Sequence, residues 1–102
     1  MGWKIIIAPS AQADLEDIVR YIAQHNSDAA ARMGYELITR AESVAAFPEI
    51  GRVVPEFRQP DLREVICRSY RVIYRLRRDE QRIDIVRFWH GARGFPHIPM
   101  GG

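Results

Sequence analysis

Hydrophobic residues recur at helical spacing in two stretches of the first half of the chain. In the first, from about residue 11 to residue 25, they lie three or four residues apart: Ala11, Leu15, Ile18 and Ile22. The spacing repeats after a turn at residues 26–28, with Ala30, Met33, Leu37, Ala41 and Val44. Ser10 can cap the first helix, and the second ends by Phe47, because a residue before proline avoids the helical conformation. The pattern therefore predicts an antiparallel helical hairpin whose apolar stripe needs a covering layer.

Runs of β-forming or strictly alternating residues predict four strands. A short run at residues 3–8 ends at Pro9, and three longer runs follow the hairpin at residues 62–67, 70–77 and 82–90. The middle run places apolar side chains on one face and three guanidinium groups on the other: Tyr70, Val72, Tyr74 and Leu76 alternate with Arg71, Ile73, Arg75 and Arg77. We therefore expect an α+β fold in the order βααβββ, with an antiparallel sheet packed against the hairpin. We expect one domain over residues 1–102, in which the Gly- and Pro-rich residues 91–102 form an extended C-terminal tail.

Composition and cysteine usage narrow the class of protein. The chain has 102 residues, of which 47% are hydrophobic and 27% charged, as is ordinary for a folded globular domain. Its single cysteine, Cys67, cannot form an internal disulfide, which favours a reducing compartment. The longest apolar run near the start, residues 5–8, is too short for a signal peptide or a membrane span. We therefore expect a cytoplasmic protein that does not enter a membrane.

The charges are distributed unevenly along the chain. Residues 1–51 carry four basic and seven acidic side chains, a net charge of −3. Residues 52–102 carry eleven arginines and six acidic side chains, a net charge of +5. Guanidinium groups form paired hydrogen bonds with phosphate and carboxylate groups. The C-terminal part is therefore expected to present an unpaired basic field to an anionic partner.

Motifs for cofactors and metals are missing from the sequence. It contains no phosphate-binding loop, dinucleotide fingerprint, nucleophile elbow or metal-spaced cluster of Cys and His, so we expect no cofactor and no metal. One candidate site is left, in which Arg71, His90 and Arg93 meet at one edge of the sheet, near Arg63 and Arg68. These groups would suit a polyanionic partner, or would stabilise the pentacovalent phosphate of RNA cleavage. The alternative is a solvated arginine face in which His90 hydrogen-bonds to the backbone.

Six segments, in order and with suitable gaps, resemble the RelE/ParE superfamily of bacterial toxins. They are ADLEDI at residues 13–18, YIA at 21–23, FPEIGR at 47–52, LRE at 62–64, YRVIY at 70–74 and HGAR at 90–93. The resemblance covers about residues 4–93 and implies a small cytoplasmic toxin that inhibits growth. It also implies a helical hairpin on an antiparallel sheet, in agreement with the layout expected from the hydrophobic pattern.

The superfamily has two branches with different activities. RelE-like members cleave messenger RNA on the ribosome, whereas ParE-like members poison DNA gyrase. The chain resembles the ParE-like branch more closely, because it has a long hairpin and an HGAR ending and lacks the lysines of the RelE-like branch. The alternative is a RelE-like ribosome-dependent mRNA endonuclease, in which Arg71, His90 and Arg93 would be catalytic. A third possibility outside the toxins is a domain that binds nucleic acid nonspecifically through an arginine-rich sheet.

The resemblance further implies a cognate antitoxin that binds and silences the toxin. The excess of arginine leads us to expect an acidic antitoxin, and we expect its binding segment to fold on contact. The side chains expected to bind the partner are the arginines of the strands and of one turn: Arg63, Arg68, Arg75, Arg77 and Arg87.

Overall fold

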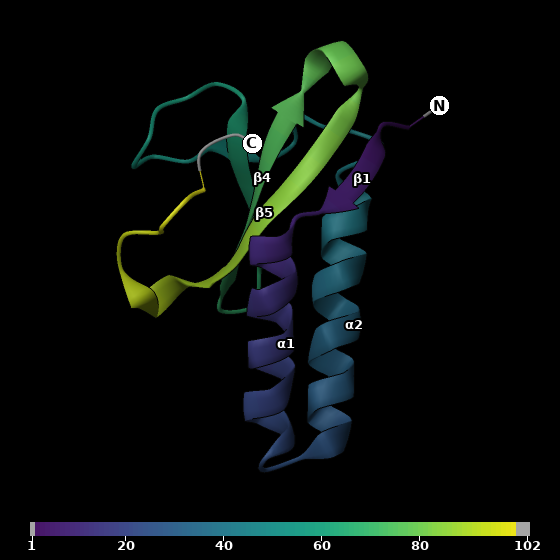
Figure 1. Ribbon diagram of the computed structural model, residues 1–102, viewed down its shortest axis with the longest axis vertical. Helices are drawn as coiled ribbons and strands as arrows, with labels where there is room; N and C mark the ends of the chain where they lie inside the picture. Colours follow the sequence, from purple (N-terminus) through teal and green to yellow (C-terminus); the bar gives the residue numbers. More distant parts are fainter. Residues whose placement is uncertain (1, 100–102) are drawn as a thin grey trace.

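The computed structural model describes residues 2–99, which form two helices and five strands. In chain order they are β1 (Lys4–Ile7), α1 (Pro9–Ala23), α2 (Ser27–Ser43), β2 (Arg52–Val53), β3 (Leu62–Cys67), β4 (Tyr70–Arg77) and β5 (Arg82–His90). Single turns of 3₁₀-helix, η1 (Arg78–Glu80) and η2 (Gly91–Arg93), follow β4 and β5. The two long helices lie side by side as a hairpin that reaches past the sheet (Figure 1). The α+β architecture predicted from the sequence is confirmed, and the three predicted strands after the hairpin have the predicted bounds.

The sheet is mixed, in the order β1-β5-β4-β3-β2. Strands β3, β4 and β5 pair in antiparallel fashion, as predicted. Strand β2 also pairs antiparallel with β3, but β1 lies parallel to β5 at the edge. The parallel pair is possible because the helical hairpin carries the chain between β1 and the rest of the sheet, and parallel neighbours need such a long connection. Strand β2 was not predicted, since two residues are too few to show any alternation.

The starting point of α1 differs from the prediction. Pro9 is the first helical residue, and Ala8 precedes it without a side-chain cap. Proline suits this position because the first helical amide has no partner within the helix. Ser10 therefore lies inside the helix, and its hydroxyl donates to the carbonyl of Val86 at 2.6 Å. The second helix is capped as expected in the predicted turn, where the side chain of Asn26 accepts from the amide of Ala29 at 3.0 Å.

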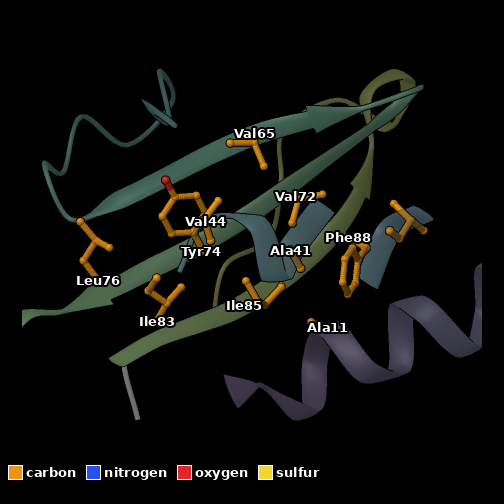
Figure 2. Packing of buried hydrophobic residues seen from close by; sticks show 11 residues of the cluster. Ala11, Ala41, Val44, Val65, Val72, Tyr74, Leu76, Ile83, Ile85 and Phe88 are labelled. Carbon is orange, nitrogen blue, oxygen red and sulfur yellow. The ribbon is translucent and has the colours of Figure 1, made fainter. Parts of the chain in front are cut away.

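The main core lies between the sheet and the hairpin (Figure 2). Its strand side chains include Val72, Tyr74, Ile85 and Phe88, which are almost completely buried. Tyr74 also has its polar end satisfied, because its hydroxyl donates to the carbonyl of Pro48 at 2.8 Å and accepts from the amide of Gly51 at 3.0 Å. The predicted inward position of Tyr74 is therefore confirmed.

The opposite face of the sheet carries a second, smaller core. It consists of Val54, Leu62, Ile73, Val86 and Trp89, with Phe57 and Ile98 packed against it. Ile73 is fully buried and Arg71 is only 9% exposed. The alternative of a solvated arginine face on β4 is therefore wrong, because the segment between β2 and β3 and the C-terminal tail cover this face.

The C-terminal tail turns back at Gly94, whose φ of +87° is favourable only for glycine. Residues 94–99 then follow the second core, with Pro96 buried. Three hydrogen bonds attach their carbonyls to the sheet: Trp89 Nε1 donates to Gly94, Arg87 Nη1 to His97 and Arg75 Nη2 to Pro99. The tail is thus part of the layer that covers the far face of the sheet.

The open edge of β5 is sealed by α1. Strand β1 pairs with β5 only as far as Ile85. Beyond it, Ser10 donates to the carbonyl of Val86, and Asp14 accepts from the amide of Phe88 at 3.0 Å. Side chains of α1 therefore replace a strand along this edge.

Within residues 2–99, no helix is long and apolar enough to cross a membrane.

Candidate functional site

Arg71 lies at the centre of a buried ion-pair network on the far face of the sheet. Its Nε donates to Glu64 at 2.6 Å, and its Nη1 and Nη2 donate to Glu56 at 2.8 and 2.7 Å. Glu64 is buried and also accepts from Nε of Arg52 at 2.6 Å. The hydrogen bonds from Arg71 hold the pKa of the Glu56 carboxyl below its ordinary value. All three nitrogens of the Arg71 guanidinium are therefore bound by carboxylates of the same chain.

His90 and Arg93 line a different feature, a surface hollow of about 490 Å³ beside α1. The hollow is lined by Asp14, Asp17, Ile18, Tyr21, Tyr70, Phe88, His90 and Arg93. The Nδ1 of His90 accepts from the amide of Ala92 at 3.0 Å, so this histidine caps the 3₁₀ turn that follows β5. Its ring meets that of Tyr70 edge to face, with the centroids 5.1 Å apart.

The structure does not bring Arg71 and His90 together, contrary to the prediction. In the register of β4 and β5, Tyr70 lies opposite His90, and Arg71 lies opposite Trp89. Because successive side chains point to opposite faces of a strand, Arg71 and His90 lie on opposite sides of the sheet. Arg93 lies at the edge between them, with its guanidinium 3.8 Å from the centroid of the Trp89 ring.

The expectation of an unpaired basic field is wrong for most arginines of the C-terminal part. Seven of them form ion pairs with carboxylates of the same chain: Arg52, Arg68, Arg71, Arg77, Arg78, Arg82 and Arg87. Among the predicted partner-binding residues, Arg68 binds Glu36, Arg77 binds Asp84 and Arg87 binds Asp14. The sequence could not show this, because most of these carboxylates lie far away along the chain.

The other two predicted partner-binding arginines contact the backbone. Arg63 donates to the carbonyls of Pro60 and Gly51, each at 3.0 Å. Arg75 is half-buried rather than solvated, and burial lowers the pKa of its guanidinium. Whether any of the five predicted arginines contacts a partner stays a prediction.

Sequence reasoning missed the residues that α1 contributes to the hollow. The available signal was spacing: three residues of α1 lie three or four positions apart and so share one face of the helix, namely Asp14, Asp17 and Tyr21. Periodicity alone could not place that face beside Tyr70. Within residues 2–99, no group of three or more His, Cys, Asp or Glu side chains could hold a metal ion.

Comparison with known proteins gives one family match and several similar structures. A family model described as the ParE toxin of the type II toxin–antitoxin system parDE matches residues 5–95. A chain of the chromosomal ParDE system from P. aeruginosa has a TM-score of 0.70 and 16% identity, covering 86% of this chain and 95% of that chain.

A chain of the toxin–antitoxin complex RelBE2 from Mycobacterium tuberculosis is similar to almost the same degree. Its TM-score is 0.67 at 16% identity, and the match covers 88% of this chain and 99% of that chain. None of the curated proteins compared with the sequence matches it significantly. At these identities the two structures establish a shared fold, whereas the family is established by the match over residues 5–95.

Proposed function

The chain belongs to the ParE toxin family of type II toxin–antitoxin systems, and from this membership we propose that it arrests bacterial growth by poisoning DNA gyrase. A cognate antitoxin neutralises it. In this function the toxin acts as a binding protein and not as an enzyme.

The ion pairs of Arg71 support gyrase poisoning over messenger RNA cleavage. A nuclease of the RelE-like type would need this guanidinium at the scissile phosphate, where charge develops in the transition state. Here Glu64 and Glu56 already occupy it, and both pairs are largely removed from solvent. Releasing it would break both pairs and leave the largely covered Glu56 carboxylate without its partner, which is unfavourable.

The surroundings of His90 support the same choice. A general base works best when a second group orients it within hydrogen-bond reach of the substrate. Within residues 2–99, no carboxylate hydrogen-bonds to His90, and its Nδ1 is bound to the backbone amide of Ala92. His90 and Arg71 also lie on opposite sides of the sheet, so they cannot act on one phosphate.

We infer that the antitoxin is acidic and that its binding segment folds on contact. In the C-terminal part, the arginines without an ion pair within residues 2–99 are Arg58, Arg63, Arg75 and Arg93. Arg58 and Arg93 are exposed, and Arg63 and Arg75 are half-buried. These cations, far apart along the chain, favour an extended acidic segment, and disordered segments cover extended surfaces when they fold on binding.

The test compares the two targets with the same purified toxin. DNA supercoiling and cleavage are measured with purified gyrase, and message cleavage is measured with translating ribosomes. We expect gyrase-linked DNA breaks and intact message. Message cleavage with gyrase unaffected would overturn the proposal and make the protein a ribonuclease.

A further inference from the structure

The hollow beside α1 contains hydrogen-bond donors that the chain itself leaves unused. Arg93 forms no ion pair within residues 2–99, and its guanidinium lies over the ring of Trp89. The Nδ1 of His90 accepts a hydrogen bond from Ala92, so the proton of the neutral ring is on Nε2. That N–H is available as a donor. Both residues line the same hollow.

The walls of the hollow are aromatic and apolar. Tyr21 and Ile18 line it from the helix, and Tyr70 and the almost completely buried Phe88 line it from the sheet. Burial and the neighbouring Tyr21 raise the pKa of Tyr70, so its phenol keeps its proton and is a further donor. A ligand here therefore needs an acceptor group and also an apolar part that can pack on these walls.

The carboxylates of the hollow are already engaged. Asp14 accepts two hydrogen bonds from Arg87 at 2.7 Å and a third from the amide of Phe88. Asp17 is exposed and pairs with Arg20 at 3.1 Å. Neither carboxylate forms a salt bridge with Arg93, which stays free to bind an anion from outside.

We propose that this hollow binds one Asp or Glu side chain of the cognate antitoxin, with an adjacent apolar residue packed against Ile18 and the exposed ring of Tyr21. This inference rests on the antitoxin pairing in the proposed function. The carboxylate would accept from Arg93 and from Nε2 of His90. A nucleic-acid backbone fits less well, because it carries a row of phosphates and, among residues 2–99, Arg93 is the one Arg or Lys side chain that lines the hollow. A single carboxylate needs no further cation.

Two pairs of variants test the proposal in binding measurements with the full-length antitoxin. In His90→Asn the amide oxygen can replace Nδ1 as the acceptor for Ala92, but the donor at Nε2 is lost. His90→Gln instead carries an amide nitrogen at the position of Nε2. Arg93→Ala removes the free cation, and Arg58→Ala removes another exposed arginine, which lies between β2 and β3 and does not line the hollow.

We expect His90→Asn and Arg93→Ala each to weaken antitoxin binding by ~10-fold or more, as loss of a hydrogen bond to a charged group does. His90→Gln and Arg58→Ala should stay within about threefold of the parent, which is small on this scale. Titration calorimetry gives the dissociation constants, after circular dichroism has shown that each variant is folded.

Other results would overturn the proposal in distinguishable ways. Equal affinity of the antitoxin for the parent and all four variants would show that the antitoxin does not bind in the hollow. Unchanged antitoxin binding with lost gyrase inhibition in Arg93→Ala would assign the hollow to the target instead. If the parent itself failed to bind the antitoxin, the pairing in the proposed function would fail together with this inference.

Discussion

Tyr74 contributes to stability through its ring and through its hydroxyl, and the two contributions can be separated. Tyr74→Phe should cost ~1–2 kcal/mol of unfolding free energy, because the amide of Gly51 and the carbonyl of Pro48 lose their partner. Tyr74→Ala should cost ~3–5 kcal/mol, since it also leaves a cavity in the core. Urea denaturation measures both. Tyr35→Phe, at a tyrosine that is 75% exposed, should have no effect. Equal losses at Tyr74 and Tyr35 would contradict this account of the core.

The pairing of Glu56 with Arg71 makes stability depend on pH in the acid range. The pKa of Glu56 in the folded chain is below its ordinary value of 4.5, so the unfolded chain takes up this proton first as the pH falls. The stabilisation is therefore complete above about pH 4.5 and is lost as the pH drops through the folded-state pKa.

We expect Glu56→Gln to be less stable than the parent at pH 7 and to lose less stability on acidification. Chemical denaturation at a series of pH values measures this difference. Glu16→Gln, at an exposed position on α1, should keep the parental pH dependence. If Glu56→Gln were less stable than the parent by the same amount at every pH, the ion pair would not explain the loss of stability in acid.

Sequence reasoning located Arg71 on β4 but not its surroundings. The strand alternation is local, and so it predicts the face to which Arg71 points. Glu56, which neutralises Arg71, lies 15 residues earlier in a segment without periodicity, and no pattern shows that this segment folds back over the sheet. The same limit applies to His90, because its neighbours in the hollow come largely from α1.

The seal between α1 and β5 gives a prediction about local opening. Asp14 accepts from Arg87 and from the amide of Phe88 and is almost fully buried. Asp14→Asn removes the charge of this pair and should cost ~3 kcal/mol, as breaking a buried ion pair does. The amide of Phe88 should also exchange with solvent faster, which hydrogen exchange by NMR detects.

Asp17→Asn is the matched control for this change. Asp17 lies one turn further along α1, but its side chain is 75% exposed and its ion pair with Arg20 is on the surface. Such pairs contribute little, so Asp17→Asn should change the unfolding free energy by less than about 1 kcal/mol. Equal effects of the two substitutions would mean that α1 does not seal the edge of β5.

How well the bounds of each element could be predicted depends on the sequence signals at its two ends. Strands β3, β4 and β5 have the predicted bounds, because turn residues interrupt their apolar runs at both ends. The start of α1 was missed by two residues, since Pro9 suits both the end of a strand and the first turn of a helix. The edge strand β2 is held by pairing with β3 and not by its own sequence.

The covering tail gives a prediction for the whole chain. Ile98 packs on the second core, so Ile98→Asp should detach the tail and cost ~1–3 kcal/mol, about the value of one buried apolar side chain. Thermal unfolding measures the loss. His97→Ala should have little effect, because His97 is exposed and contributes its backbone carbonyl to Arg87. Equal melting temperatures for Ile98→Asp and the parent would show that the tail does not stabilise the sheet.

The position of the tail was not predictable from the sequence. Its glycines and prolines indicate an irregular segment, and they show neither a period nor a preferred face. Its contacts come from Trp89, Arg87 and Arg75, which become neighbours of the tail only when the sheet has formed. The hydrophobic pattern thus defines the layer between the hairpin and the sheet better than the layer on the other side.

The parallel pairing of β1 with β5 has a consequence for the timing of synthesis. Strand β1 is translated well before its neighbour β5, and Ser10 and Asp14 bond to Val86 and Phe88 of β5. Translation proceeds at ~5–20 residues per second, so the nascent hairpin waits several seconds for its sheet. Until β5 has left the ribosome, the side of α1 that packs against β5 is uncovered. A message broken before this last strand therefore yields an unfolded fragment, open to proteolysis, instead of an active toxin.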